Sequence, residues 1–198
     1  IQAAAREQWA SVTASMGIEA EPPKNFEEAF RSGGEAIQAM LAVDVSIESA
    51  TASAAEQLKA QRTETRDAAY AALAAAVKLV DKKTNPDEAA QARYQLAWLD
   101  WEAGDAGQAA ERAEFVARRD ATTPSGEEAA RLTLAALERL QSNGASDASG
   151  RLRDFVAFVM EQWPNTEVAA SASAVLVSNA LRSGDLAAAE QVLETVPK

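Results

Sequence analysis

Residues 86–124 read PDEAAQARYQLAWLDWEAGDAGQAAERAEFVARRDATTP, and this stretch decides the fold class. Apolar residues recur three to four positions apart over 87–103 and again over 106–120, which is the period of an amphipathic helix. Gly104-Asp105 separates the two runs, and acidic residues open the first run, where they suit the helix dipole. The stretch therefore predicts a helix, a tight turn and a second helix.

The same pattern recurs with a period of about 40 residues. Isolated prolines alternate with Gly-containing turn signals, in the order Pro86, Gly104-Asp105, Pro124, Asn143-Gly144, Pro164 and Gly184-Asp185. The prolines and the turn glycines thus form two interleaved series that share this period. Self-similarity at this length is typical of stacked helical hairpins, so we expect further helix pairs downstream.

These downstream pairs show the same helical spacing. Ser125-Gly126-Glu127-Glu128 opens the next helix in the manner of a capping box, with an acceptor and a Glu three residues apart. Its partner lies near 147–162, and the last pair covers 166–182 and 185–195. The apolar positions of the middle pair are Leu132, Leu134, Leu137 and Leu140, followed by Leu152, Phe155, Val156, Val159 and Met160.

Upstream of Pro86 the pattern leaves an alternative open. Residues 47–61 and 65–83 form either a further helix pair or one long helix from about 47 to 83, because Thr63-Glu64-Thr65 contains no helix breaker. Residues 1–16 and 25–44 are expected to be helical, with Gly33-Gly34 interrupting the second helix. We therefore divide the chain into an N-terminal helical segment (1–45), a hairpin or long helix (46–86) and repeats (87–198), the repeats being 87–124, 125–164 and 165–198.

The composition excludes several chemistries. The 198 residues include 48 alanines and 15 leucines but no His and no Cys. There is therefore no Ser-His-Asp or Cys-His nucleophile pair, no thiolate or imidazole zinc site and no disulfide. Alanine is the best helix former and a poor strand former, so its excess favours an all-α fold. We expect no catalytic residue, no metal site and no cofactor.

The charge and hydropathy limit the partners. The net charge of −11 disfavours nucleic acids and anionic membrane surfaces, both of which bind Lys and Arg. No apolar run approaches the ~20 residues that a bilayer-spanning helix needs, so we expect no membrane insertion. The chain begins at Ile1 without a Met or a signal peptide, so we expect a mature or excised piece of a larger protein.

From Leu96-Ala97 onward, the order of Gly104-Asp105, Ala109, Ala113 and Pro124 resembles a tetratricopeptide repeat. The final unit matches with Leu176, Gly184-Asp185, Ala188-Ala189 and Val192-Leu193. The middle unit departs from the family pattern, since Asn143-Gly144 replaces Gly-Asp, and the period exceeds the usual repeat of about 34 residues. The resemblance implies an all-α, right-handed α-α superhelix of stacked antiparallel hairpins over 87–198, and as an alternative over 47–198.

Within that family, Phe155 and Phe158 followed by Trp163-Pro164-Asn165-Thr166 are similar to repeats of bacterial cell-envelope proteins. These include outer-membrane assembly lipoproteins and the periplasmic partner of the Tol-Pal system. This likeness favours the periplasm or cell envelope over the cytoplasm, while the composition leaves the compartment open.

Tyr94, Trp98 and Trp101 stand at i, i+4 and i+7 and form an aromatic stripe on one predicted helix. In tetratricopeptide-like arrays the corresponding face lines a concave groove, and aromatic residues are common anchors of protein interfaces. Gln91 and Arg139 are predicted on the same inner face as polar lining. The alternative, which we favour for the rings, is that the stripe packs against the preceding helix, where alanines leave room.

Other polar and aromatic residues have structural interpretations. Asp100 and Glu102 point apart on a helix and cannot form an acid/base pair by themselves. Arg118-Arg119 and Arg151-x-Arg153 are interpreted as local ion-pair partners of Glu111, Glu114 or Asp154, with carboxylate binding as the alternative. Trp163, beside Pro164, is expected to fill the junction between stacked hairpins.

The leading functional hypothesis is a non-catalytic scaffold or adaptor whose concave face binds a protein or peptide, in an oligomeric state that the sequence does not reveal. The alternative is a structural spacer segment of a larger multi-repeat envelope protein. An enzyme or sugar-binding protein would need carboxylates that converge in a cleft, and the sequence locates none. Adaptor function through the stripe predicts that Tyr94 and Trp98 are largely exposed.

Overall fold

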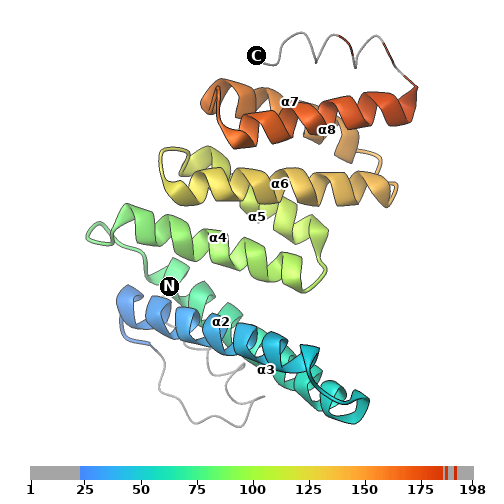
Figure 1. Cartoon of the computed structure of the whole chain (residues 1–198). Coiled ribbons are helices and arrows are strands. Elements are labelled where there is room, and N and C mark those ends of the chain that lie inside the picture. The colour runs from blue at the N-terminus through green and yellow to red at the C-terminus, as the bar shows by residue number, and fades with distance from the viewer. Residues whose placement is uncertain (1–22, 185, 187–189, 191–198) are drawn as a thin grey trace. The chain divides into compact units, whose positions relative to one another are not determined.

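The computed structural model describes residues 23–184, 186 and 190, and in this part of the chain it contains helices and turns but no strand. The prediction of an all-α fold is confirmed for these residues. The helix predicted at 1–16 lies outside the described residues. Of the helix predicted at 185–195, only residues 186 and 190 are described. Figure 1 shows the helices in chain order: α2 (Phe26–Glu48), α3 (Ala52–Leu79), α4 (Pro86–Glu102), α5 (Ala106–Arg119), α6 (Pro124–Ser142), α7 (Ala148–Gln162) and α8 (Glu167–Ser183).

The chain divides into two compact units, Ile1–Leu99 and Asp100–Lys198. The boundary falls inside α4, close to the end of that helix. The first unit therefore contains α2, α3 and most of α4, and the second contains the end of α4 with α5 to α8. No helix in the described residues is both long and apolar enough to cross a bilayer.

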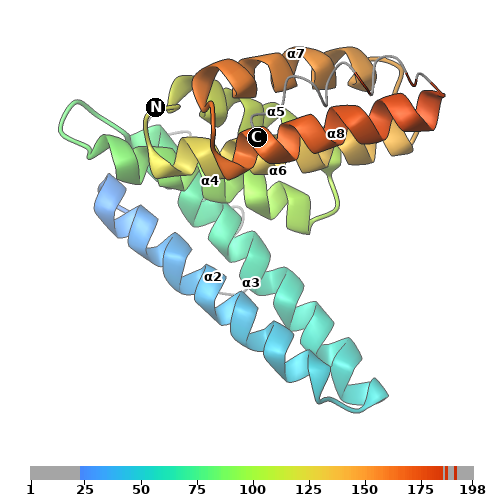
Figure 2. The same cartoon turned by 45° about the horizontal axis from the view of Figure 1, so that its top comes forward.

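The hairpin α2–α3 forms most of the first unit, and its two helices lie side by side along their length (Figure 2). α3 is one helix without a break at 63–65, so the structure shows one long helix rather than a pair. Its bounds are narrower than the 47–83 expected, because residues 47–48 still belong to α2. The hydroxyls of Thr63 and Thr65 donate to the carbonyls of Lys59 and Gln61, each at 3.0 Å. These bonds to the preceding turn satisfy the hydroxyls without interrupting the helix.

Gly33-Gly34 does not interrupt α2, and that part of the prediction is wrong. Gly33 is buried, and a Cβ atom placed on it would lie 2.6 Å from Leu73 Cγ and 2.7 Å from Leu73 Cδ2. The glycine is therefore a point of close contact between α2 and α3. Helical geometry costs glycine about 1 kcal/mol relative to alanine, and here the packing of the neighbouring helix outweighs that preference.

The core of the first unit combines a few large side chains with many alanines. Met40 and Leu73 are fully buried, and each contributes about 1.5–3 kcal/mol of apolar burial. The alanines let the helices approach closely around these side chains. The buried residues of this core are Phe26, Ala29, Ile37, Met40, Ala69, Leu73, Ala75, Ala76, Ala92, Leu96 and Leu99.

In the second unit each helix packs on the next, α5 on α6, α6 on α7 and α7 on α8, and α6 also contacts α8. The turns between helices are those that the sequence predicted. Gly104 and Gly144 both have φ of 83°, and Gly184 has φ of 74°. This left-handed conformation is accessible to glycine at little cost, so the regular spacing of these glycines marks real helix ends.

The start of α6 differs from the prediction. The N-cap is Thr123 rather than Ser125, and the Thr123 hydroxyl accepts from the Gly126 backbone N–H at 3.2 Å. Pro124 is the first helical residue, where its missing N–H leaves no bond unmade, so the capping residue must precede it. The predicted apolar positions of α6 and α7 are buried, except that Leu140 and Met160 are half-buried.

Candidate functional site

The aromatic stripe lies on α4, and the first two of its rings belong to the first unit. Trp98 packs against the core of that unit, and both Tyr94 and Trp98 are half-buried. The expectation that these two side chains are largely exposed is therefore not met. For Trp98 the packing against this core favours the interpretation in which the ring is part of the packing rather than of an open groove. Gln91, one turn before Tyr94, is exposed.

The third ring belongs to the second unit and meets one of the predicted lining residues. The Arg139 guanidinium carbon lies 5.2 Å from the centre of the Trp101 ring, which is cation–π distance. Trp101 is half-buried near the end of α4, and Arg139 is exposed in the last turn of α6. Two residues that are far apart in the chain, and that the sequence predicted on one face, are thus in contact.

Arg139 differs from the other arginines of α6 and α8. Arg131 pairs with Glu127 at 2.7 Å and with Glu128 at 2.8 Å, and Arg182 lies 3.6 Å from Glu138. Within the described residues, no carboxylate lies within ion-pair distance of Arg139, and the residue is exposed to solvent. An arginine held over an indole in this way can still donate hydrogen bonds to a carboxylate or a carbonyl of a partner.

Asp100 is the buried carboxylate of the second unit, and its partner there is Arg112. Their Oδ2 and Nε atoms lie 2.9 Å apart as an ion pair, although they lack the alignment of a hydrogen bond. Burial raises the pKa of Asp100 above its ordinary value, and the Arg112 charge opposes that rise only in part. Asp105 repels the carboxylate and adds to the rise in pKa. Asp100 therefore carries its charge against a desolvation cost.

The arginines of α5 and α7 are engaged within the second unit. Glu114 accepts from Arg118 Nε at 3.0 Å and from Arg151 at 3.1 Å, so one carboxylate joins the two helices. The interpretation as a local ion pair thus holds for Arg118 with Glu114, whereas Arg151 reaches Glu114 across two helices rather than within one. Arg119 pairs instead with Asp120, at 3.7 Å.

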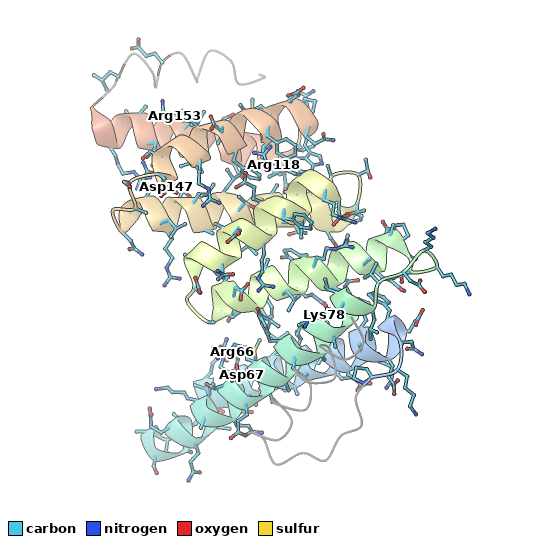
Figure 3. All side chains as sticks on the ribbon, turned by 180° about the vertical axis from the view of Figure 1, so that it is seen from behind. Arg66, Asp67, Lys78, Arg118, Asp147 and Arg153 are labelled. Carbon is cyan, nitrogen blue, oxygen red and sulfur yellow. The ribbon has the colours of Figure 1, made fainter. Side chains whose placement is uncertain are left out.

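The structure adds ring contacts that the sequence analysis missed. The Arg118 guanidinium lies 4.5 Å from the centre of the Phe158 ring and 5.5 Å from that of Phe155 (Figure 3 labels Arg118). Phe158 also meets Trp163 edge-on, with ring centres 5.6 Å apart. Arg118 and Phe158 are separated by one repeat period in the sequence, so the period itself was a signal that could have paired them.

Trp163 connects two turns of the second unit. Its indole N–H donates to the Ala121 carbonyl at 3.2 Å, and Ala121 lies in the turn between α5 and α6. The Trp163 side chain thereby ties the turn after α7 to the turn one repeat earlier. Both residues are half-buried, so the bond is sheltered from water.

A hollow of about 310 Å³ lies in the first unit, where the start of α2 meets the turn after α3. Its charged groups already serve the local structure. Asp81 accepts from the backbone N–H of Lys83 at 2.7 Å and of Thr84 at 3.1 Å, and the Lys83 bond is the main cause of its lowered pKa. Asn25 caps α2 by accepting from the Glu28 N–H at 2.8 Å. The hollow is lined by Lys24, Asn25, Phe26, Glu27, Leu79, Asp81, Lys83 and Thr84.

Across residues 23–184, 186 and 190, no three His, Cys, Asp or Glu side chains are grouped to hold a metal ion. No protein-family model, curated protein or solved structure gives a significant match to this chain. The structure brings Trp101 and Arg139, two of the predicted site residues, into contact.

Proposed function

We propose that this chain is a non-catalytic scaffold that binds a protein or peptide partner through the α6 face on which Arg139 lies over Trp101. The observation that carries the proposal is the pair itself, an exposed guanidinium without a carboxylate partner among the described residues, placed 5.2 Å from an indole ring. Arg and Trp are the residue types most enriched among interface residues that dominate binding energy.

The energetics suit a site that remains available. A cation–π contact at an exposed position contributes about 0.5–1 kcal/mol. A hydrogen-bonded ion pair between Arg139 and a carboxylate of the partner would be stronger than this contact. The Trp101 ring therefore orients the Arg139 side chain, while the N–H groups of the guanidinium remain available to a partner. Arg131 and Arg182, whose donors face carboxylates of this chain, have less to offer a partner.

The proposal includes a tetratricopeptide-like arrangement, in which alternate helices contribute to one binding face. Support comes from the left-handed glycines that follow α4, α6 and α8 at regular intervals, and from the direct contact of α6 with α8. In arrays of helical hairpins, the first helices of successive hairpins line an extended concave surface. In this arrangement α4, α6 and α8 are the first helices, and Trp101 and Arg139 belong to two of them.

The test compares capture of interacting proteins by the wild type and four purified variants. Arg139→Ala and Arg139→Glu remove or reverse the exposed charge, and Arg153→Ala and Arg153→Glu are matched controls at an exposed arginine of α7. A partner held by this face binds the Arg153 variants as it binds the wild type. Its affinity for the Arg139 variants falls at least tenfold, or about 1.4 kcal/mol. Equal binding to all forms would exclude this face.

A second candidate, the structural spacer, is favoured by one observation. Trp98 packs against the core of the first unit and leaves that part of the stripe unavailable to a partner. A spacer has no ligand of its own, so the wild type and all four variants would recover the same background proteins. The capture experiment therefore separates the two candidates.

A further inference from the structure

Asn143 is an exposed asparagine followed by an exposed glycine, and its side-chain amide makes no hydrogen bond to another described residue. The pair forms the end of α6. Asn143 is the C-cap residue with ψ of 3°, and Gly144 follows it with φ of 83°. A Cβ atom placed on Gly144 would meet nothing within 4 Å, so the space around this peptide bond is open. We propose that Asn143-Gly144 is a self-modification site at which the asparagine amide is converted to a carboxylate.

The reaction needs only water. The backbone nitrogen of Gly144 loses its proton and attacks Cγ of Asn143. The Cγ–Nδ2 bond then breaks, and the amide nitrogen takes up a proton and leaves as ammonia. The product is a five-membered succinimide ring. Water opens this ring at Cγ to give aspartate, or at the main-chain carbonyl to give isoaspartate. In total, one water enters and one ammonia leaves, with no oxidant or cofactor.

The other asparagines of the chain are worse placed for this ring closure. Asn85 precedes Pro86, which has no N–H to lose, and Asn165 precedes the β-branched Thr166, whose side chain crowds the attacking nitrogen. The Asn25 side chain is held by the Glu28 N–H, and Asn179 lies within α8. Asn143 alone combines an exposed amide with a following residue that has no side chain.

The fold governs the rate through the helix cap. The Gly144 N–H donates to the Gln141 carbonyl at 2.9 Å, and the Ala145 N–H donates to the Leu140 carbonyl at 3.0 Å. This is the Schellman arrangement of a helix C-terminus, and it holds the attacking nitrogen on the helix. The ring closes when the cap opens, and helix ends open more readily than helix interiors. Unfolding the chain is therefore expected to accelerate the conversion.

The conversion changes the charge beside the proposed binding pair. Asn143 lies one turn after Arg139 on α6, so the new carboxylate lies near a guanidinium that has no carboxylate partner among the described residues. It also places a negative charge at the C-terminus of a helix, which the dipole disfavours. The isoaspartate product adds a methylene group to the main chain and disrupts both cap bonds. An effect of this conversion on partner binding depends on the proposed function. The conversion of Asn143 itself does not depend on it.

The experiment incubates the 198-residue chain at neutral and mildly alkaline pH, both folded and in urea, and follows each asparagine by peptide mass spectrometry. We expect Asn143 to convert several-fold faster than Asn165 of the same molecules in the folded chain. We also expect isoaspartate among the products, and a further acceleration in urea. Equal rates at Asn143 and Asn165 in the folded chain would overturn the proposal, and so would aspartate without isoaspartate. Because mass spectrometry detects the chemical change itself, failure to capture a partner would not count against this proposal.

Discussion

The Arg118 guanidinium on α5 lies 4.5 Å from the centre of the Phe158 ring on α7, and these two residues are one repeat apart in the sequence. The Nε atom of the same arginine donates to Glu114 at 3.0 Å. A charged side chain thus connects two helices that are not neighbours in the chain.

This contact predicts an energetic coupling between Arg118 and Phe158. In a double-mutant cycle of Arg118→Ala and Phe158→Leu, measured by urea unfolding, we expect a coupling of about 0.5–2 kcal/mol, because the ring is half-buried. The pair of Arg119 and Phe115 is the control, since its ring and charge lie 5.6 Å apart on a more exposed surface. Equal coupling in the two pairs would contradict this account of Arg118.

Gly33 and Gly34 predict opposite responses to the same substitution. Gly33→Ala places a Cβ atom 2.6 Å from Leu73 Cγ, and Leu73 is fully buried and cannot move aside. We expect a loss of about 1–3 kcal/mol of unfolding free energy from overpacking. Gly34→Ala meets nothing within 4 Å and should gain about 0.5–1 kcal/mol of helix propensity. Chemical denaturation of both variants checks the prediction, and a stabilised Gly33→Ala variant would refute it.

The cap assignment at α6 predicts which hydroxyl matters. Thr123→Ala removes the acceptor for the Gly126 N–H and the donor to the Asp120 carbonyl, so we expect a loss of about 0.5–2 kcal/mol. Ser125→Ala, the residue that the sequence pattern suggested, should change stability by less than about 0.5 kcal/mol. Thermal unfolding of the two variants distinguishes Thr123 from Ser125 as the N-cap. A larger loss of stability in Ser125→Ala than in Thr123→Ala would favour Ser125.

Asp100 predicts a pH dependence with a definite sign. Its pKa is raised above the ordinary value of 3.8, so the folded chain binds this proton more tightly than the unfolded chain does. The contribution of Asp100 to stability therefore falls as pH rises from 3.8 through the raised pKa. Asp100→Asn removes this titration. Its stability relative to the wild type should increase over that window, and urea midpoints across the acidic range measure the difference. A constant difference would show that burial does not control this carboxyl group.

The sequence predicted most of the helices and turns, and the reasons are local. The three-to-four spacing of apolar residues in 87–103 and 106–120 sets which side of a helix is apolar, whatever that helix later packs against. The turn glycines were recognisable because their left-handed φ suits glycine at Gly104 and Gly144. The misplaced cap at Ser125 was also a local matter, since Pro124 already indicated that the capping residue precedes it.

The candidate site was predicted less well. Of the aromatic stripe, Trp101 meets Arg139 as the shared inner face suggested, but Trp98 packs against the core of the first unit. Periodicity placed the three rings on one face of α4. It did not say how much of that face other helices cover, because coverage depends on side chains that are distant in the chain.

The sequence by itself determined that this chain is helical, that its turns recur at a regular interval, and that it lacks His and Cys chemistry. These properties follow from residue type and short-range spacing. Only the tertiary structure decided that Gly33 is a contact point for Leu73, that Arg118 lies over Phe158, and that Arg139 meets Trp101. Each of those contacts joins residues on different helices, far apart in the chain. Their geometry is set by how closely alanine-lined helices approach, which no single segment specifies.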